Sequence, residues 1–347
     1  MERKKLSDIA WNVDEATYRA DPAYSYSTLS RFQREGFNGL PNLFTKIETP
    51  SLTFGSVVDT LVTGTKEEFD ERFLVASFPD LQDNRIKAIK EVYSLSAGAD
   101  WDSIPDSVFN TAIENVQFQM NWKPETRLRV IKECGKEYYD LLCISADKTI
   151  ISNDLYLDAI ACVDALKSSP ATKEFFGYED PFDTDTERFY QLKFKGSFDG
   201  ISLRCMADCI LVNHKYKYVC PVDLKTSSHK EWDFGKSFIE YRYMIQAQLY
   251  WYLIRKAMDN DDYFKDFKLL NYRFIVVCNS SRIPLAWEFE DTQSIVDFKY
   301  GKNVIPHWTK IVKELDYYLK NSSIVPIGIN TSSTNSLKSW INSQYGE

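Results

Sequence analysis

The sequence predicts a mixed α/β fold in which helices flank a β-sheet. Strand-like runs with alternating side chains gather between residues 187 and 224, and apolar residues recur at helical spacing before and after them. With 347 residues, of which 44% are hydrophobic, the chain is long enough to bury a full core. We therefore expect one elaborated domain over residues 1–347.

The N-terminal helices are expected within residues 20–80. The segment from Ser25 to Phe32 offers several N-cap residues ahead of its apolar positions. A second helix carries Gly55 and Asp59 four residues apart on the flank of its apolar stripe, which places the aspartate at the edge of the buried face. This helix is marked by an apolar stripe of Phe54, Val57, Val58, Leu61 and Val62. Residues 80–180 are helical in pattern, mixed in charge and without a chemical motif, which predicts a helical insertion or supporting layer.

The core sheet is expected within residues 181–300. Asp199-Gly200 is a good hairpin turn between the first two strands. A long helix is expected from Ser237 to Met258, and a helical C-terminal extension covers residues 301–347, with its helix at 304–319. The predicted strands are Glu187–Lys195, Ile201–Val212, Tyr216–Leu224, Tyr272–Cys278 and Ala286–Phe289.

Ionisable residues stand near the ends of two adjacent predicted strands. Asp208 comes near the end of one, and Asp223-Leu224-Lys225 ends the next. Across a hairpin with an even-residue loop, an even residue opposes an odd one on the same face. This parity places Asp208, Asp223 and Lys225 on one face together with Glu187. Gln246 and Tyr250 follow at i, i+4 on the downstream helix, where both can hydrogen-bond a lysine, a water or a phosphate.

Such a cluster indicates a site for a divalent cation. Clustered carboxylates repel one another and lose hydration unless cations bind, and oxygen ligands suit Mg²⁺ or Mn²⁺. A nearby lysine can orient a metal-bound water and neutralise charge that develops on a phosphate. For Asp-x-Lys alone, a solvated strand with ordinary surface charges is the favoured alternative. Asp208, fifteen residues upstream, and the helix downstream reverse that preference.

Bulk properties exclude several other classes of protein. The net charge of −8 argues against a protein that coats nucleic acid by bulk electrostatics. No run approaches a membrane helix and the N-terminus lacks a signal-peptide core, so the cytoplasm is expected. The seven cysteines form no Cys-x-x-Cys pair, which indicates free thiols.

The order of these motifs resembles the PD-(D/E)XK nuclease superfamily in its RecB-like branch, and within it the RecE-like (exonuclease VIII) nuclease domains. The likeness rests on Gly55-x3-Asp59, Asp208, Asp223-Leu224-Lys225-Thr226 and Gln246-x3-Tyr250. It implies a restriction-endonuclease-like mixed sheet. The family usually has a histidine at the position of Asp59, and a carboxylate there can still bind Mg²⁺.

The resemblance also implies the role of each motif residue. Asp208 and Asp223 would be metal ligands together with the Leu224 carbonyl, and Lys225 would be the catalytic lysine. Gln246 and Tyr250 would orient the site and the DNA. Asp59 would complete the metal site, and Glu187 stands where such nucleases often carry a further carboxylate.

The activity implied is that of an exodeoxyribonuclease dependent on Mg²⁺ or Mn²⁺. It would degrade linear double-stranded DNA from its ends, 5′ to 3′, in phage-type recombination. A single-strand annealing recombinase as partner and a homo-oligomeric ring are implied in the same way. Two alternatives stay open: a nuclease of the same superfamily acting on single strands, flaps or RNA, and a catalytically silent DNA-binding protein.

Overall fold

The computed structural model describes residues 2–45, 47–78, 80–145 and 148–321. The chain divides into two compact units, the first formed by residues 1–47 and 164–347 and the second by residues 48–163. The predicted helical insertion at 80–180 overlaps the second unit, which begins earlier and already contains the helix of Asp59. A single domain over residues 1–347 stays a prediction, and residues 322–347 of the expected C-terminal extension lie outside the described residues.

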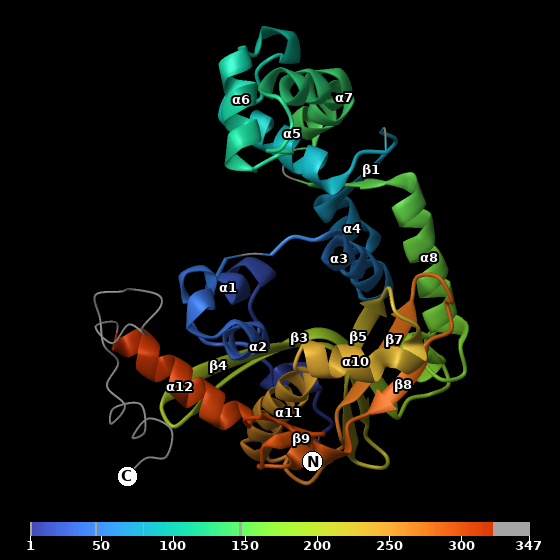
Figure 1. Cartoon of the computed structure of the whole chain (residues 1–347). Coiled ribbons are helices and arrows are strands. Elements are labelled where there is room, and N and C mark those ends of the chain that lie inside the picture. The colour runs from blue at the N-terminus through green and yellow to red at the C-terminus, as the bar shows by residue number, and fades with distance from the viewer. Residues whose placement is uncertain (1, 46, 79, 146–147, 322–347) are drawn as a thin grey trace. The chain divides into compact units, whose positions relative to one another are not determined.

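The first unit is built on a mixed sheet, as the sequence predicts. Its strand order is β3-β4-β5-β7-β8, and a short β6 also pairs with β5. The β5–β7 pair is parallel, whereas β3–β4, β4–β5 and β7–β8 are antiparallel (Figure 1). The expected fold class, a mixed sheet flanked by helices, is therefore confirmed. The strands are β3 (Thr186–Phe198), β4 (Ile201–Asn213), β5 (Tyr218–Ser227), β6 (Lys268–Leu269), β7 (Arg273–Cys278) and β8 (Leu285–Glu288).

The hairpin between β3 and β4 turns where the sequence predicts. Phe198 pairs with Ile201, and the two residues between them both have positive φ, 48° at Asp199 and 78° at Gly200. Positive φ at both central residues is the requirement of a type I′ turn, which aspartate and glycine tolerate well. The turn thus sets the register of the two longest strands.

Helices cover this sheet and close the core of the first unit. The helix α11 packs against β3 and β4, and α2 and α12 pack against α11 in turn. Ile245, Leu249 and Ile254 of α11 are fully buried in this core. The α-helices are α1 (Glu15–Ala20), α2 (Tyr26–Glu35), α9 (Lys173–Phe176), α10 (Phe234–Glu240), α11 (Tyr243–Asp259) and α12 (Trp308–Lys320). Shorter elements are η1 (Leu6–Ile9), η2 (Gly36–Asn42), η4 (Glu231–Asp233), η5 (Glu290–Gln293) and the hairpin β9 (Phe298–Tyr300) with β10 (Asn303–Ile305).

Two predicted helices differ from the structure. The single helix expected over 237–258 is wrong, because it breaks between α10 and α11 at Tyr241 and Arg242. Arg242 adopts a left-handed conformation with φ of 62°, and its guanidinium donates to Gln33 Oε1 and to the Ile239 carbonyl. These contacts outweigh local helix propensity. The helix expected over 304–319 starts later, because its first residues form β10.

The second unit is mainly helical, as the pattern of residues 80–180 predicts. A hydrophobic core of α5, α6 and α7 buries Ile89, Phe109, Ile131 and Tyr139. The parallel pair of β1 with β2 was not expected from the sequence, because each strand has only four residues. The elements are α3 (Pro50–Thr63), α4 (Lys66–Arg72), β1 (Phe73–Ala76), α5 (Asp83–Ser96), η3 (Trp101–Ser103), α6 (Asp106–Asn115), α7 (Pro124–Ile144), β2 (Thr149–Ser152) and α8 (Asn153–Ser168), which continues into the first unit.

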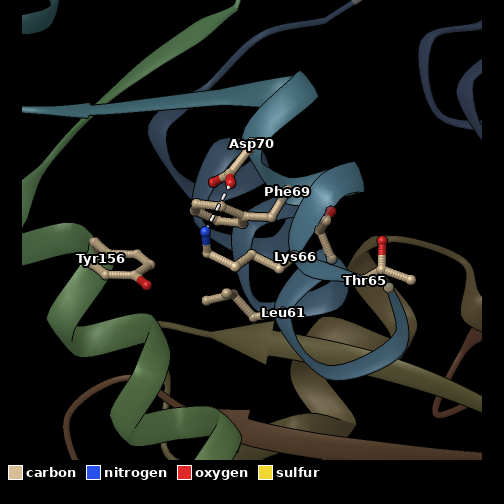
Figure 2. A pocket seen from close by; sticks show the side chains of 8 residues that line it. Leu61, Thr65, Lys66, Phe69, Asp70 and Tyr156 are labelled. Atoms are coloured by element: carbon tan, nitrogen blue, oxygen red, sulfur yellow. Dashed lines mark ion pairs between the residues drawn. The ribbon is translucent and has the colours of Figure 1, made fainter.

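A pocket of about 230 Å³ lies within the second unit, between α3, α4 and the first turn of α8. Figure 2 shows the Phe69 and Tyr156 side chains on its wall, with ring centroids 5.5 Å apart, and Lys66 paired with Asp70 at 3.2 Å. None of the residues predicted for the metal site lines it.

Among residues 2–321, so far as they are described, none of the helices combines the length and the apolarity needed to span a bilayer.

Candidate active site

At Asp208, the backbone pairing of β4 is interrupted on both sides, toward β3 and toward β5. Pairing of β4 with β5 runs from Asn213–Tyr218 to Cys209–Val222 and goes no further. On the other side, pairing with β3 passes from Tyr190–Cys209 to Leu192–Ala207, and Gln191, opposite Asp208, has φ of 54°. The strands β4 and β5 therefore diverge at Asp208.

The Asp208 carboxylate maintains contact across this fork. Its Oδ2 accepts the Leu224 N–H at 2.8 Å, taking the place of the strand carbonyl that would bond this group in a continued ladder. Extending the β4–β5 register by one step places Asp208 opposite Asp223, which agrees with the predicted parity. The fold thus brings the two aspartates to adjacent positions on neighbouring strands.

Asp223 is buried, with 1% of its surface exposed, and both of its oxygens are engaged. Gln246 Nε2 of α11 donates to Oδ1. Lys225 Nζ lies 2.5 Å from Oδ2, an ion pair without the alignment of a hydrogen bond. Asp223, Lys225 and Gln246 therefore converge, as the sequence predicts for three members of the proposed site.

Lys225 is held as an ammonium ion at neutral pH. Burial by itself would lower the pKa of Lys225, but the carboxylates of Asp223 and Asp208 outweigh it and raise that pKa above its usual range. The Tyr243 ring supports the same charge, with its centroid 4.6 Å from Nζ. With its pKa raised in this way, Lys225 carries the positive charge that can stabilise negative charge nearby.

Tyr250 is the second predicted residue on α11, and its side chain is packed in the core beside the site. It is buried and packs edge to face against Tyr272, with ring centroids 6.0 Å apart. Burial raises the pKa of both phenols well above the usual value, so both stay protonated. Within the described part of the chain, Gln246 Oε1 and the Tyr272 hydroxyl are buried and have no hydrogen-bond partner.

Tyr243 and Tyr272 were missed by the sequence reasoning as parts of this site. Tyr243 precedes Gln246 by three residues, and the sequence pattern does place it on the same helix face, but no role in the site was predicted for it. Tyr272 gives no such signal, since it reaches the site from the residue before β7.

Glu187 does not join this group. It pairs with Val212 near the start of β3, four residues from the position opposite Asp208, which corresponds to about 13 Å along the strand. There its carboxylate forms an ion pair with Arg3 at 3.0 Å and lies 3.1 Å from His214 Nε2, within hydrogen-bond distance. Strand parity predicted that Glu187 shares a face with Asp208, but parity carries no information on how far apart the two residues lie along the strand.

Asp59 lies on α3, in the second unit. It is partly buried, and its backbone carbonyl accepts the Thr63 hydroxyl at 2.8 Å. Its place beside Asp208 and Asp223 stays a prediction.

The residues at the fork fit a hard divalent cation. No three histidine, cysteine or acidic side chains gather as a metal site in the described ranges, so the protein donors would be two carboxylates and the Leu224 carbonyl. Mg²⁺ is commonly held by one or two carboxylates, and waters and phosphate oxygens fill its other positions. The buried Asp223 Oδ2, without an aligned hydrogen bond, is a suitable donor. All seven cysteines are free thiols, as expected, and five of them are buried, whereas Cys134 is partly buried and Cys143 is exposed.

Comparison with known proteins places the chain in no family. No family model matches it, and no curated protein matches it. A crystal structure from Eubacterium rectale, described as a "Putative exonuclease", matches with a TM-score of 0.28 and 13% identity, over 83% of this chain and 89% of that chain. A TM-score at this level carries no argument about fold or function.

Proposed function

We propose that this protein is a nuclease that hydrolyses phosphodiester bonds with the help of Mg²⁺ or Mn²⁺. One observation carries the proposal: two aspartates meet at the fork of β4 and β5, and Lys225 Nζ lies 2.5 Å from one of them. A buried cluster of this kind costs free energy, so its presence points to a binding role.

Each residue has a role that follows from its contacts. Asp208, Asp223 and the Leu224 carbonyl would hold the cation, which when bound lowers the pKa of a coordinated water and polarises the phosphate. Lys225, positively charged, stabilises the charge that develops on the phosphate oxygens. Gln246 acts as a positioning residue through its hydrogen bond to Asp223 Oδ1. Tyr250, one helical turn further along α11, packs beside this group.

The finer proposal takes linear double-stranded DNA as the substrate, digested from its ends in the 5′ to 3′ direction. It rests on the resemblance of the motifs to RecE-like nucleases, which also brings in phage-type recombination, an annealing recombinase as partner and a ring of identical subunits. Asp59 would complete the metal site in place of the family histidine.

Digestion of end-labelled DNA tests this function. With Mg²⁺, the wild type is expected to degrade linear duplex and to leave closed circular duplex intact, and a chelator should stop the reaction. Asp208→Asn keeps an acceptor for the Leu224 N–H but removes one charge, so it should fold and lose cleavage. Asp259→Asn changes an exposed aspartate paired with Arg255 and is the matched control.

Other outcomes would change the assignment. Cleavage of single strands, flaps or RNA in preference to duplex would move the protein to another nuclease activity at the same site. Metal-independent DNA binding without cleavage of any substrate would contradict the proposal and favour a silent binding protein.

A further inference from the structure

The chain between α10 and α11 is held in a fixed, unfavourable conformation. Arg242 has φ of 62°, and a non-glycine residue persists there only where its surroundings hold it. Its Nε donates to Gln33 Oε1 at 2.5 Å, and the Tyr26 hydroxyl donates to the Tyr241 carbonyl at 2.6 Å. The backbone of Tyr241 is thus fixed from both sides.

The Tyr241 side chain nevertheless points toward solvent. It is 41% exposed, although tyrosines of this core are generally buried. The Arg34 guanidinium lies 5.8 Å from its ring centroid, and Arg34 Nε donates to the Ser30 carbonyl at 3.3 Å. A fixed, exposed aromatic ring beside an exposed cation is the combination that single-stranded nucleic acid binds.

The Tyr241 ring lies next to the candidate active site, because Tyr243 contacts both Tyr241 and Lys225. The centroids of Tyr241 and Tyr243 are 5.7 Å apart, and that of Tyr243 is 4.6 Å from Lys225 Nζ. These two distances place the Tyr241 ring within about 10 Å of the ammonium group. Tyr243 also stacks with Phe234 and with Phe274, each with ring centroids 5.7 Å apart, so its ring is packed on more than one neighbour.

We propose that Tyr241 is a stacking platform for an unpaired nucleobase of the strand being cleaved, and that Arg34 contacts a phosphate of the same strand. The inference rests on the proposed nuclease function. Bases follow one another at about 3.4 Å along a strand, so a phosphate at Lys225 brings a neighbouring base within reach of Tyr241. The base at a duplex end separates from its partner at small cost, and every base offers a face for stacking.

A fluorescent base tests the platform. The probe is a linear duplex with 2-aminopurine as the terminal base, bound in Ca²⁺ so that turnover does not interfere. Stacking on tyrosine or tryptophan quenches 2-aminopurine, so the wild type and Tyr241→Trp should quench it. Tyr241→Ala should lose the quenching and bind about tenfold more weakly, within the range of one base–aromatic stack.

Two further variants separate the parts of the proposal. Tyr216→Ala removes a 70% exposed tyrosine in the β4–β5 turn and should match the wild type. Arg34→Gln should keep the quenching but reduce the slope of log affinity against log salt by about one, as expected for one lost phosphate contact. Circular dichroism verifies that each variant is folded.

The outcomes distinguish this inference from the function on which it rests. If the wild type degrades linear DNA while Tyr241→Ala quenches and binds like the wild type, the platform is overturned and the nuclease stands. If the wild type neither binds nor degrades DNA, the proposed function fails and the platform fails with it.

Discussion

Both units of this chain carry exposed ion pairs, but the first unit also buries one in its sheet. In the first, the sheet buries Asp223 and pairs it with Lys225, whose side chain is 19% exposed. In the second, ion pairs such as Lys66–Asp70 and Lys132–Asp106 lie on the surface, with every partner at least 40% exposed. Exposed pairs stabilise a protein little, and a buried charged pair costs free energy unless its attraction and hydrogen bonds offset the loss of hydration, so a buried pair is often retained for another role. On this comparison we assign the proposed chemistry to the first unit, whereas the second is held together by its apolar core.

The largest expected effect comes from the buried pair. Lys225→Ala should lower the cleavage rate by about a hundred- to a thousandfold, the usual loss when one group that stabilises transition-state charge is removed. Duplex affinity measured in Ca²⁺ should change only a few-fold, because metal and backbone contacts remain. Lys236→Ala, an exposed lysine of the same unit, is the control. Equal losses of binding and cleavage would show Lys225 to be a structural residue.

A second buried group makes the stability of the first unit depend on pH. Burial lowers the pKa of His307 from 6.5 to about 4. Between these values the unfolded chain binds more protons than the folded protein, so the free energy of unfolding falls as pH falls from about 6.5 to about 4. The loss is on the order of 3 kcal/mol.

Urea unfolding at pH 7 and pH 5 measures this dependence. His307→Asn keeps a residue that can cap α12 and should flatten the pH profile. His229→Asn, at an exposed histidine, should leave the profile unchanged. An equally steep profile in His307→Asn would place the titrating group elsewhere.

Asp59 tests whether the second unit contributes to the metal site. If it does, Asp59→Asn should weaken Mn²⁺ binding about tenfold and so lower the stabilisation by Mn²⁺ by about 1.4 kcal/mol. Thermal unfolding with and without Mn²⁺ measures this, and Asp70→Asn in the same unit is the control. Asp59→His should shift preference from Mg²⁺ toward Mn²⁺, because imidazole is the softer ligand. An unchanged Mn²⁺ effect in both variants would assign the chemistry to the first unit alone.

The smallest effect is expected at the surface of the second unit. Lys66→Ala removes an ion pair with partners that are 83% and 56% exposed. The unfolding midpoint should move by no more than about 1 °C, because solvent and salt screen such pairs. A shift of several degrees in differential scanning calorimetry would contradict the proposed contrast between the units.

Local patterns in the sequence determined the elements and several of their side-chain relations. Alternation marked the strands, Asp199-Gly200 marked the hairpin, and parity placed Asp208 opposite Asp223. The helical spacing of Gln246 relative to Tyr250 likewise predicted one face, and Gln246 does reach Asp223. These relations depend on neighbours along one or two strands or turns, so they can be read from residue order.

Tertiary structure decided the features that depend on distant segments. The Glu187 carboxylate contacts Arg3 and His214, and strand parity cannot predict these contacts. The break before α11 follows from Gln33 and Tyr26, some 200 residues away in sequence, which hold Tyr241 and Arg242. Beyond Asp208, where β4 no longer pairs with β5, Tyr24 pairs with Leu203 of β4. Long-range hydrogen bonds of this kind override local propensity. A buried polar group left without a partner costs more free energy than the local preference for a helix or strand supplies.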